Sequence, residues 1–483
     1  MRSAPEEPGV STGIPGPPPV PVLGYRGNFL SFVADAPKRL RELHHRYGEV
    51  VALARGRSDC LFVFSPRYNR LVLGDPDLFR NLDAASSPVR MRDGSSLSRL
   101  YAGLTTMNGE RHRRQRALMA AALARRHVEA YGPDITTLAE RHFDRWRIGG
   151  QVDALAEMRT LTMAVAVKTL LGLDPGGVGS DMGRLLQGWM DAVFSVPSLA
   201  LPMDLPGLPY HRLQVLSRRL EAAVRELIRA RQAGPRGAPD VLGRLTQAVD
   251  GQGARFTDDE LVGQAAFLFM AGHATTASAL AWTLLLLCAH PAVTRDLVDE
   301  LDGVLGGLAP DAEKLTALPL LDRVVRESLR LLPPVMWWGK TAAGDVDLGP
   351  YRLAAGAQVI FSPYITHRLA ELYPDPDRFR PGRWLTLRPG PYEYLPFSAG
   401  PRGCLGAGFA LMEVKLVLAV LLQRCRPELR PGARIDCGGL MVSQPRPGLP
   451  VTLAGPAGRG PDIELRGGIR HLVRLDRNWR DRR

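Results

Sequence analysis

Apolar residues recur three and four positions apart along most of the chain, a spacing that places them on one face of a helix. By this criterion the sequence predicts helices at residues 36–47, 110–124, 133–147, 154–172, 181–195, 210–232, 261–289, 320–332 and 407–423. Short β-branched and aromatic runs predict strands at 50–54, at 60–64 and within about 346–361. The predicted fold class is mainly α, with a smaller β portion near the N-terminus.

Proline and glycine mark the segments that lack this periodicity. Residues 1–24 carry five prolines between positions 15 and 21 and predict an extended lead-in. Residues 84–106 are rich in serine and glycine and predict a long loop, of the kind that in compact proteins is usually either functional or disordered. The proline-rich residues 197–209 predict a connector between two helices.

The most apolar segment, residues 261–289, is the predicted centre of the fold. Thr257 followed by Glu260 is a capping-box signal for a helix start, and Pro291 predicts the helix end. The segment is long enough to span a membrane, but polar residues within it, such as His273, argue against lipid on all sides. We therefore expect a buried central helix and no membrane span.

The cysteine content indicates a reducing compartment. The chain has 483 residues, of which 45% are hydrophobic, enough to bury a sizeable core. Its cysteines are odd in number, scattered and without a CxxC pair: Cys60, Cys288, Cys404, Cys425 and Cys437. The first 21 residues contain no long apolar run of the kind that forms a signal peptide or an anchor. We expect a cytoplasmic protein that is a monomer.

The net charge of +13 comes from arginine, and part of the excess lies in residues 460–483, a predicted basic C-terminal tail. Two interpretations of this charge stay open: a surface that docks an acidic electron carrier, or a solvated, partly disordered tail. A nucleic-acid partner is not expected, because Trp479 is the tail's one aromatic residue and no known binding module is present.

One cysteine stands in a distinctive frame. Residues 397–406 read Phe-Ser-Ala-Gly-Pro-Arg-Gly-Cys-Leu-Gly, and the predicted helix 407–423 follows. The glycines allow the backbone to pack closely against a flat partner. The start of the helix is expected to lower the pKa of the Cys404 thiol, and Arg402 adds a permanent cation. A thiolate held in this way suits a metal such as iron.

This pattern, F-x-x-G-x-R-x-C-x-G, resembles the haem-binding loop of the cytochrome P-450 family. It is matched at Phe397, Gly400, Arg402, Cys404 and Gly406. The resemblance implies that Cys404 is the axial ligand of a haem b iron, that Arg402 pairs with a haem propionate, and that Phe397 packs beside the sulfur. It spans roughly residues 10–455 and implies no bound flavin or iron–sulfur cluster.

The middle of the predicted central helix carries Ala271-Gly272-His273-Ala274-Thr275-Thr276. From the residues alone, Gly272 permits close approach to the backbone, and a threonine hydroxyl bonding four residues back can kink the helix. The family's oxygen-activation motif is A-G-x-(D/E)-T-T, and the match implies that Thr275 contacts the oxygen being activated. Ala274 replaces the family's acid, so the proton route or the reaction outcome differs. His273 points about 100° away around the helix and is not expected to donate protons.

Two further groups of cations match family positions. His112 and Arg116 are four residues apart and share a helix face, which by itself is most simply a solvated basic face. The resemblance implies instead that both hold a haem propionate, and that Lys340, where the family often has arginine, does the same.

The pair Glu327 and Arg330 has the spacing of an ordinary surface ion pair. With Arg383, it resembles the family's buried triad that supports the haem loop, a structural role. By the same comparison, Met336 and Trp337 line the substrate pocket, although adjacent tryptophans are more often plain core.

The resemblance implies one haem domain, residues 25–459, that acts as a monooxygenase. It would insert one oxygen atom of dioxygen into a C–H or C=C bond of a lipophilic terpenoid, polyketide or fatty-acyl molecule, with electrons from an external ferredoxin and its reductase. Two alternatives stay open. One is a haem-thiolate enzyme of non-inserting chemistry: oxidative coupling, desaturation, rearrangement or peroxide-driven oxidation. The other is a non-catalytic helper protein.

Overall fold

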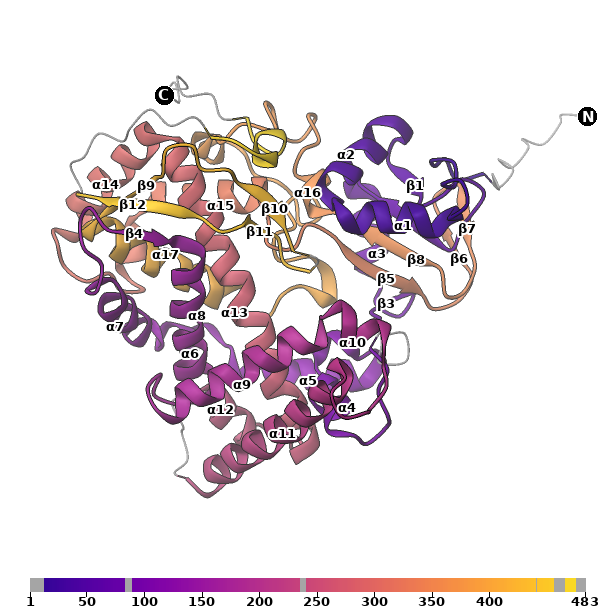
Figure 1. Cartoon of the computed structure of the whole chain (residues 1–483), viewed down its shortest axis with the longest axis horizontal. Helices are drawn as coiled ribbons and strands as arrows, with labels where there is room; N and C mark the ends of the chain where they lie inside the picture. Colours follow the sequence, from indigo (N-terminus) through magenta and orange to yellow (C-terminus); the bar gives the residue numbers. More distant parts are fainter. Residues whose placement is uncertain (1–12, 83–88, 235–239, 440, 456–464, 475–483) are drawn as a thin grey trace, which may run out of the picture.

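A computed structural model describes residues 13–82, 89–234, 240–439, 441–455 and 465–474, and shows a predominantly helical body beside a smaller sheet portion (Figure 1). The helices are α1 (Gly24–Ala34), α2 (Ala36–Tyr47), α3 (Pro66–Gly74), α4 (Ser96–Tyr101), α5 (Gly109–Ala122), α6 (Arg125–Glu129), α7 (Gly132–Phe143), α8 (Ala154–Leu171), α9 (Val178–Val193), α10 (Val196–Ala200), α11 (Pro209–Ala233), α12 (Val241–Gln247), α13 (Asp258–Ala289), α14 (Pro291–Leu305), α15 (Pro319–Leu331), α16 (Pro363–Thr366) and α17 (Ala407–Arg424).

The helix α13 is the axis of the helical body, as expected. Its start is the predicted capping box, in which Thr257 Oγ1 accepts from the Glu260 amide at 3.2 Å and the Glu260 carboxylate accepts from the Thr257 amide at 3.0 Å. It packs against α4, α8, α15 and α17. By length and composition α13 could cross a membrane, but 72% of its apolar window is buried within the protein. Such burial is that of a core helix.

The strands of the described residues form one main sheet and three smaller units. They are β1 (Val50–Ala52), β2 (Cys60–Val63), β3 (Phe79–Arg80), β4 (Gln151–Asp153), β5 (Trp338–Ala342), β6 (Val346–Leu348), β7 (Tyr351–Leu353), β8 (Gln358–Phe361), β9 (Arg426–Leu429), β10 (Asp436–Gly438), β11 (Gln444–Arg446) and β12 (Pro450–Ala454). The main sheet has the order β1-β2-β8-β5-β3 and lies beside α1 and α2 (Figure 1). Its parallel β2–β8 pair joins segments about 300 residues apart.

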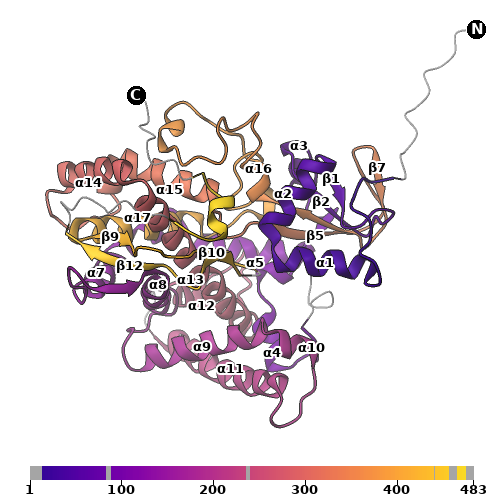
Figure 2. The same cartoon turned by 45° about the horizontal axis from the view of Figure 1, so that its top comes forward.

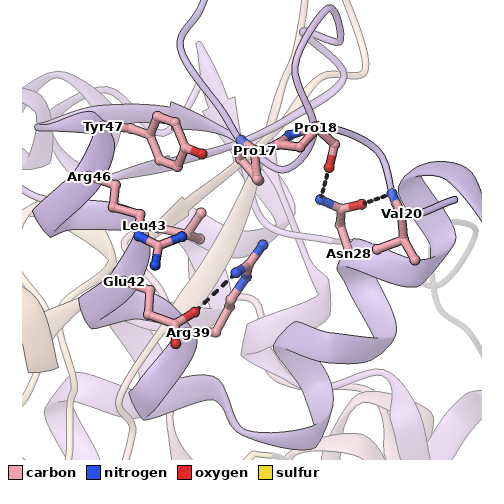
Figure 3. Close-up of a pocket in the computed structure, with 9 residues that line it drawn as sticks. All are labelled: Pro17, Pro18, Val20, Asn28, Arg39, Glu42, Leu43, Arg46 and Tyr47. Atoms are coloured by element: carbon pink, nitrogen blue, oxygen red, sulfur yellow. Dashed lines mark hydrogen bonds and ion pairs between the residues drawn. The ribbon is translucent and has the colours of Figure 1, made fainter.

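The lead-in is tied to the body rather than free. Asn28 of α1 donates to the Pro18 carbonyl at 3.2 Å and accepts from the Val20 amide at 3.0 Å. These contacts lie beside a small surface pocket that α2 closes on its other side, where Arg39 and Glu42 pair at 3.0 Å (Figure 3). The pocket is thus part of the anchoring of residues 13–23.

Three local expectations need correction. Within the predicted loop 84–106, the described residues contain α4 and a 3₁₀ turn, Leu104–Thr106, because Ser95 caps α4 and its apolar face is buried; residues 84–88 lie outside the description. The connector 197–209 contains most of α10, capped by Ser195. The strand β5 begins at Trp338, earlier than the predicted strand region, because it pairs with β8.

The C-terminal end of the chain returns to the body. The strand β12 pairs with β4 and β9, and β10 pairs with β11 in a short hairpin. Residues 465–474, which fall in the segment expected to be a basic tail, pack against this hairpin and include a 3₁₀ turn, η5 (Gly468–His471) (Figure 2).

Candidate active site

The loop that carries Cys404 is shaped by backbone geometry. Gly400 has a φ of 69°, and a Cβ at this position would lie 2.2 Å from the Leu73 carbonyl oxygen, so only glycine fits. The Cys404 amide donates to the Phe397 carbonyl at 2.9 Å and closes the loop. Gly406 then forms the N-cap of α17. The loop therefore presents Cys404 at the start of a buried helix.

The Cys404 side chain is accessible although protein atoms surround it. Burial raises the pKa of its thiol, while the Gly406 amide and the nearby Arg116 act in the opposite direction. Our expectation that the helix start would lower this pKa is therefore wrong for the protein alone, because desolvation outweighs the amide. A metal ion at the sulfur would reverse the shift, since a coordinating thiol is deprotonated.

One face of α13 is accessible in the middle of a helix that is otherwise buried. Its members are spaced by three or four residues: Phe267, Met270, Ala271, Ala274 and Thr275. Ala271 is exposed and the other four are partly buried, whereas His273 and Thr276 beside them are buried. Side chains that stay accessible in the middle of a core helix require open space beside them, so this face is not fully packed against other elements.

The threonine hydroxyls of this region bond to their own helix. Thr275 Oγ1 donates to the Ala271 carbonyl at 2.6 Å, and Thr276 Oγ1 donates to the Gly272 carbonyl at 2.8 Å. Despite these bonds, α13 runs without a break from Asp258 to Ala289. His273 points away from the accessible face, and its Nδ1 lies 2.9 Å from Thr162 Oγ1 of α8. Burial lowers the pKa of His273 to about 4.

Four basic side chains converge near the Cys404 loop: His112, Arg116, Lys340 and Arg402. Burial, followed by repulsion from the three other cations, lowers the pKa of His112 to about 4. Burial and repulsion from Arg402 lower the pKa of Lys340 to about 7. Burial, and then Arg116, lower the pKa of Arg402 to about 10. These shifts show that the cations lie close enough to repel one another, an arrangement that suits an anion of more than one charge.

Neutral groups hold the cations in place. Arg116 donates to the Gly403 carbonyl at 2.7 Å, and Arg402 donates to the Met107 carbonyl at 2.7 Å and to Asn108 Oδ1 at 2.9 Å. Lys340 donates to Asn81 Oδ1. The Asn108 side chain accepts from the Asn81 amide and donates to the Asn81 carbonyl, both at 3.0 Å. The Nε of Arg402 is buried without a partner among the described residues. The two asparagines were missed from the sequence, where single loop asparagines give no signal.

This arrangement fits a haem. The accessible thiol of Cys404 suits an iron, and the four clustered cations with an unsatisfied Arg402 nitrogen suit two carboxylates. The accessible face of α13, with only alanine at 271 and 274, leaves room for a flat ring and a substrate. Among the residues predicted from the sequence, those of α5, β5 and the Cys404 loop therefore lie in one region.

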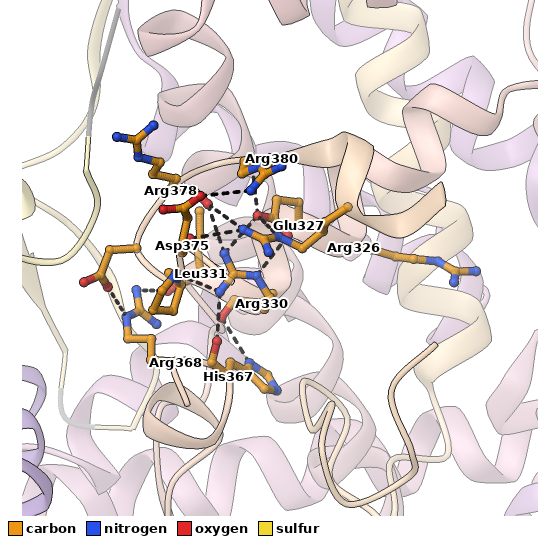
Figure 4. Close-up of polar contacts among 12 residues, drawn as sticks. Arg326, Glu327, Arg330, Leu331, His367, Arg368, Asp375, Arg378 and Arg380 are labelled. Atoms are coloured by element: carbon orange, nitrogen blue, oxygen red, sulfur yellow. Dashed lines mark hydrogen bonds and ion pairs between the residues drawn. The ribbon is translucent and has the colours of Figure 1, made fainter. Parts of the chain in front are cut away.

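A separate group of charged residues joins α15 to a later segment of the chain. Glu327 and Arg330 of α15 are fully buried and form two hydrogen bonds of 2.9 Å (Figure 4). Arg383 donates to the same carboxylate at 2.9 Å. Arg330 also donates to the carbonyls of His367, Pro376 and Arg378. The three residues therefore tie α15 to the segment 367–383.

Met336 and Trp337, the two residues predicted to line the substrate pocket, pack against other parts of the protein. Met336 is 5% exposed, and its carbonyl accepts from Ser362 Oγ at 2.8 Å. Trp337 lies edge-on to Phe32 of α1, with ring centroids 4.9 Å apart. These contacts are structural, and a role of Met336 or Trp337 in the pocket stays a prediction.

Comparisons with known proteins agree with this geometry. The family model described as Cytochrome P-450 matches residues 14–450. The cyclooctat-9-en-7-ol 5-monooxygenase of Streptomyces melanosporofaciens is 31% identical over 90% of this chain and 93% of its own length. The pentalenene oxygenase of Streptomyces avermitilis is 29% identical over 87% and 92%. The structure of retinoic acid-bound cyanobacterial CYP120A1 superposes with a TM-score of 0.79 at 27% identity, over 91% of this chain and 98% of that one.

Proposed function

The chain belongs to the cytochrome P-450 family of haem monooxygenases, and from that premise we propose that it inserts one oxygen atom into a C–H or C=C bond of a terpenoid, with Cys404 as the ligand of a haem b iron. The observation that carries this proposal is the accessible Cys404 thiol in a region where four cations converge. In the overall reaction, dioxygen, two electrons and two protons give one oxygen atom in the product and one water molecule.

When bound, the haem iron supplies the oxygen-activating redox chemistry, which a thiolate ligand promotes by donating electron density. We assign haem binding and the shielding of the sulfur to named side chains. His112, Arg116, Lys340 and Arg402 would neutralise the two propionates, and the Arg402 Nε would find its missing acceptor there. Phe397 and Gly406 would shield the sulfur, and Gly400 allows the loop to approach.

Proton handling falls to Thr275. Its hydroxyl is held by the Ala271 carbonyl on the accessible face of α13, where it can accept a hydrogen bond from water and pass a proton on. Ala274 provides no carboxylate on this face. We infer that the protons arrive through water that enters the open space beside Ala271 and Gly272, or from a hydroxyl of the substrate.

The names of the relatives support a terpenoid substrate. They refer to cyclooctat-9-en-7-ol, pentalenene and retinoic acid, which are all isoprenoid molecules with large apolar surfaces. A face of α13 with Phe267, Met270 and two alanines suits such a surface by apolar contact. We further propose that a ferredoxin and its reductase supply the electrons to a cytoplasmic monomer.

The substitution at Ala274 favours one second candidate, a haem-thiolate enzyme that couples, desaturates or rearranges its substrate without inserting oxygen. Turnover under ¹⁸O-labelled dioxygen separates the two. Label in the product supports insertion, and a converted product without label supports the second candidate.

The first test is a carbon monoxide difference spectrum of the reduced, purified protein and two variants. A strongly red-shifted Soret band in the wild type and in Cys60→Ser, and its loss in Cys404→Ser, is the expected result. Cys60 is the matched control because it is a partly buried cysteine of the sheet. A wild type without this band, or a Cys404→Ser variant that keeps it, would overturn the proposed function.

A further inference from the structure

The C-terminal residues 465–474, here called the strap, lie beyond residue 450, where the family match ends. Four of the strap's ten residues bury apolar side chains: Leu465, Ile469, Leu472 and Val473. Ile469 and Val473 are 0% and 1% exposed. A solvated tail would not bury these groups, so the strap is a packed part of the structure.

One end of the strap is bonded to the segment that leads into β10. The Ile435 amide donates to the Arg466 carbonyl at 2.9 Å, and the Ile469 amide donates back to the Ile435 carbonyl at 3.1 Å. The Gly468 amide donates to Asp436 Oδ1 at 2.6 Å. Gly467 has a φ of 98°, and a Cβ there would lie 2.3 Å from the Ile435 carbonyl oxygen. The strap therefore approaches β10 as closely as glycine allows.

The other end is fixed to the rigid part of the fold. The Leu472 carbonyl accepts from Arg41 of α2 at 3.2 Å and from Arg368 at 2.8 Å. Both arginines also pair with Asp377, and the Arg474 amide donates to the Asp377 carbonyl at 2.8 Å. In both views the strap lies between the β10–β11 hairpin and the α2–α16 region (Figures 1 and 2).

The hairpin that the strap holds is bonded to the central helix α13. The Ser443 carbonyl accepts from Ser278 and from Trp282 Nε1 of α13, the latter at 3.2 Å. The Ser443 amide and hydroxyl donate to the carbonyls of Pro334 and Pro333 at 2.8 and 2.9 Å. Ser278 lies three residues after Thr275 in the same helix. The hairpin is therefore bonded to α13 within one helical turn of Thr275.

A hairpin of two three-residue strands is marginal by itself, so its position depends on what supports it. We propose that the strap positions the β10–β11 hairpin against α13 and thereby fixes one wall of the substrate pocket, with Gly467 and Asp436 as the positioning residues. This inference rests on the proposed function, since it assumes a haem-bound pocket next to Thr275. It gives the C-terminal extension a role in substrate selectivity rather than in haem binding.

The first experiment measures the spectral binding of two probes to the haem-bound protein. Imidazole needs access to the iron only, whereas 4-phenylimidazole also needs the pocket wall. We expect Gly467→Val to raise the Kd of 4-phenylimidazole about five- to tenfold, equivalent to about 1–1.4 kcal/mol, and to leave the Kd of imidazole within about twofold. The matched control is Gly455→Val, because a Cβ at Gly455 meets no atom within 4 Å.

Substitutions of Asp436 provide a second test of the strap proposal that changes the structure less. Asp436→Ala removes the acceptor of the Gly468 amide, whereas Asp436→Asn keeps an oxygen there and loses only the charge, including its exposed pair with Arg434. We expect the alanine variant to weaken 4-phenylimidazole binding and the asparagine variant to restore most of it.

Unchanged 4-phenylimidazole binding in Gly467→Val and Asp436→Ala, or an equal loss for both probes, would overturn the strap proposal. So would folded variants that no longer take up haem, because the strap would then support the haem scaffold. The carbon monoxide spectrum of the wild type is recorded before either probe is added. If it lacks the red-shifted band, the proposed function itself is wrong.

Discussion

The fully buried carboxylate of Glu327 gives the sharpest quantitative prediction. It accepts hydrogen bonds from both Arg330 and Arg383, from Trp384 Nε1 at 3.0 Å and from the Arg380 amide at 2.9 Å. Glu327→Gln keeps the size of the side chain but removes the charge that the two buried guanidinium groups face. It also turns an NH₂ donor toward groups that are themselves donors.

The cost follows from the burial of the pair. Removing one partner of a buried ion pair costs about 3–5 kcal/mol, because the remaining charge is left uncompensated. The entropy of unfolding is about 2.1 cal/mol/K per residue, or roughly 1 kcal/mol/K for the 483 residues of this chain. Glu327→Gln should therefore lower the Tm of the haem-bound protein by about 3–5 °C.

Differential scanning calorimetry at neutral pH checks this value. The control is Glu129→Gln, which removes an exposed helical pair with Arg125 and should cost about 0–1 kcal/mol. Adding Arg383→Met to Glu327→Gln should cost less than adding it to the wild type, because the arginine has already lost its counter-charge. A Tm of Glu327→Gln within about 1 °C of the wild type would refute the reasoning, since the buried pair would then contribute no more than a surface pair.

Three further predictions concern the site. In the haem-free chain, burial and Arg402 lower the folded-state pKa of Lys340 from 10.5 to about 7. The unfolded chain then holds a proton that the folded chain has lost, so urea titrations should show stability rising between about pH 7 and about pH 10.5, and Lys340→Met should flatten this rise. If proton delivery limits the reaction, Ala274→Asp should raise the fraction of consumed electrons that is recovered in product, by up to about 10²-fold. The measurement is the ratio of product to peroxide, and an unchanged ratio would contradict this prediction. Gly400→Ala should reduce haem content, because its Cβ meets the Leu73 carbonyl, whereas Gly408→Ala, at an open position of α17, should not.

The sequence predicted the fold where local signals and tertiary packing agree. The capping box of α13, the helix α2 and the strands β1 and β2 carry their periodicity and their boundaries in neighbouring residues, and the structure confirms them. The short helices α4 and α10 were missed because a single buried turn lies below the length at which periodicity can be read. The strand β5 was missed, since its pairing with β8 rather than a local signal makes residues 338–342 a strand.

The site was predictable as a set of positions, not as an electrostatic environment. The motif residues could be found because each occupies a fixed spacing in one stretch of chain. The Asn81–Asn108 pair that seats Lys340 and Arg402 joins two loops, and no spacing reveals it. The direction of the Cys404 pKa shift was wrong for a similar reason, because desolvation comes from the whole surrounding fold rather than from the helix that follows.

The order of strands in the main sheet has a consequence for how the protein is made. The apolar strand β2 pairs in parallel with β8, which leaves the ribosome about 300 residues later. At synthesis rates of about 5–20 residues per second, the edge of β2 stays unpaired for roughly 15–60 s before β8 is synthesised. An unpaired apolar edge is a template for association with other chains. Yield should therefore depend on temperature and chaperones during synthesis, even though the finished sheet is well protected.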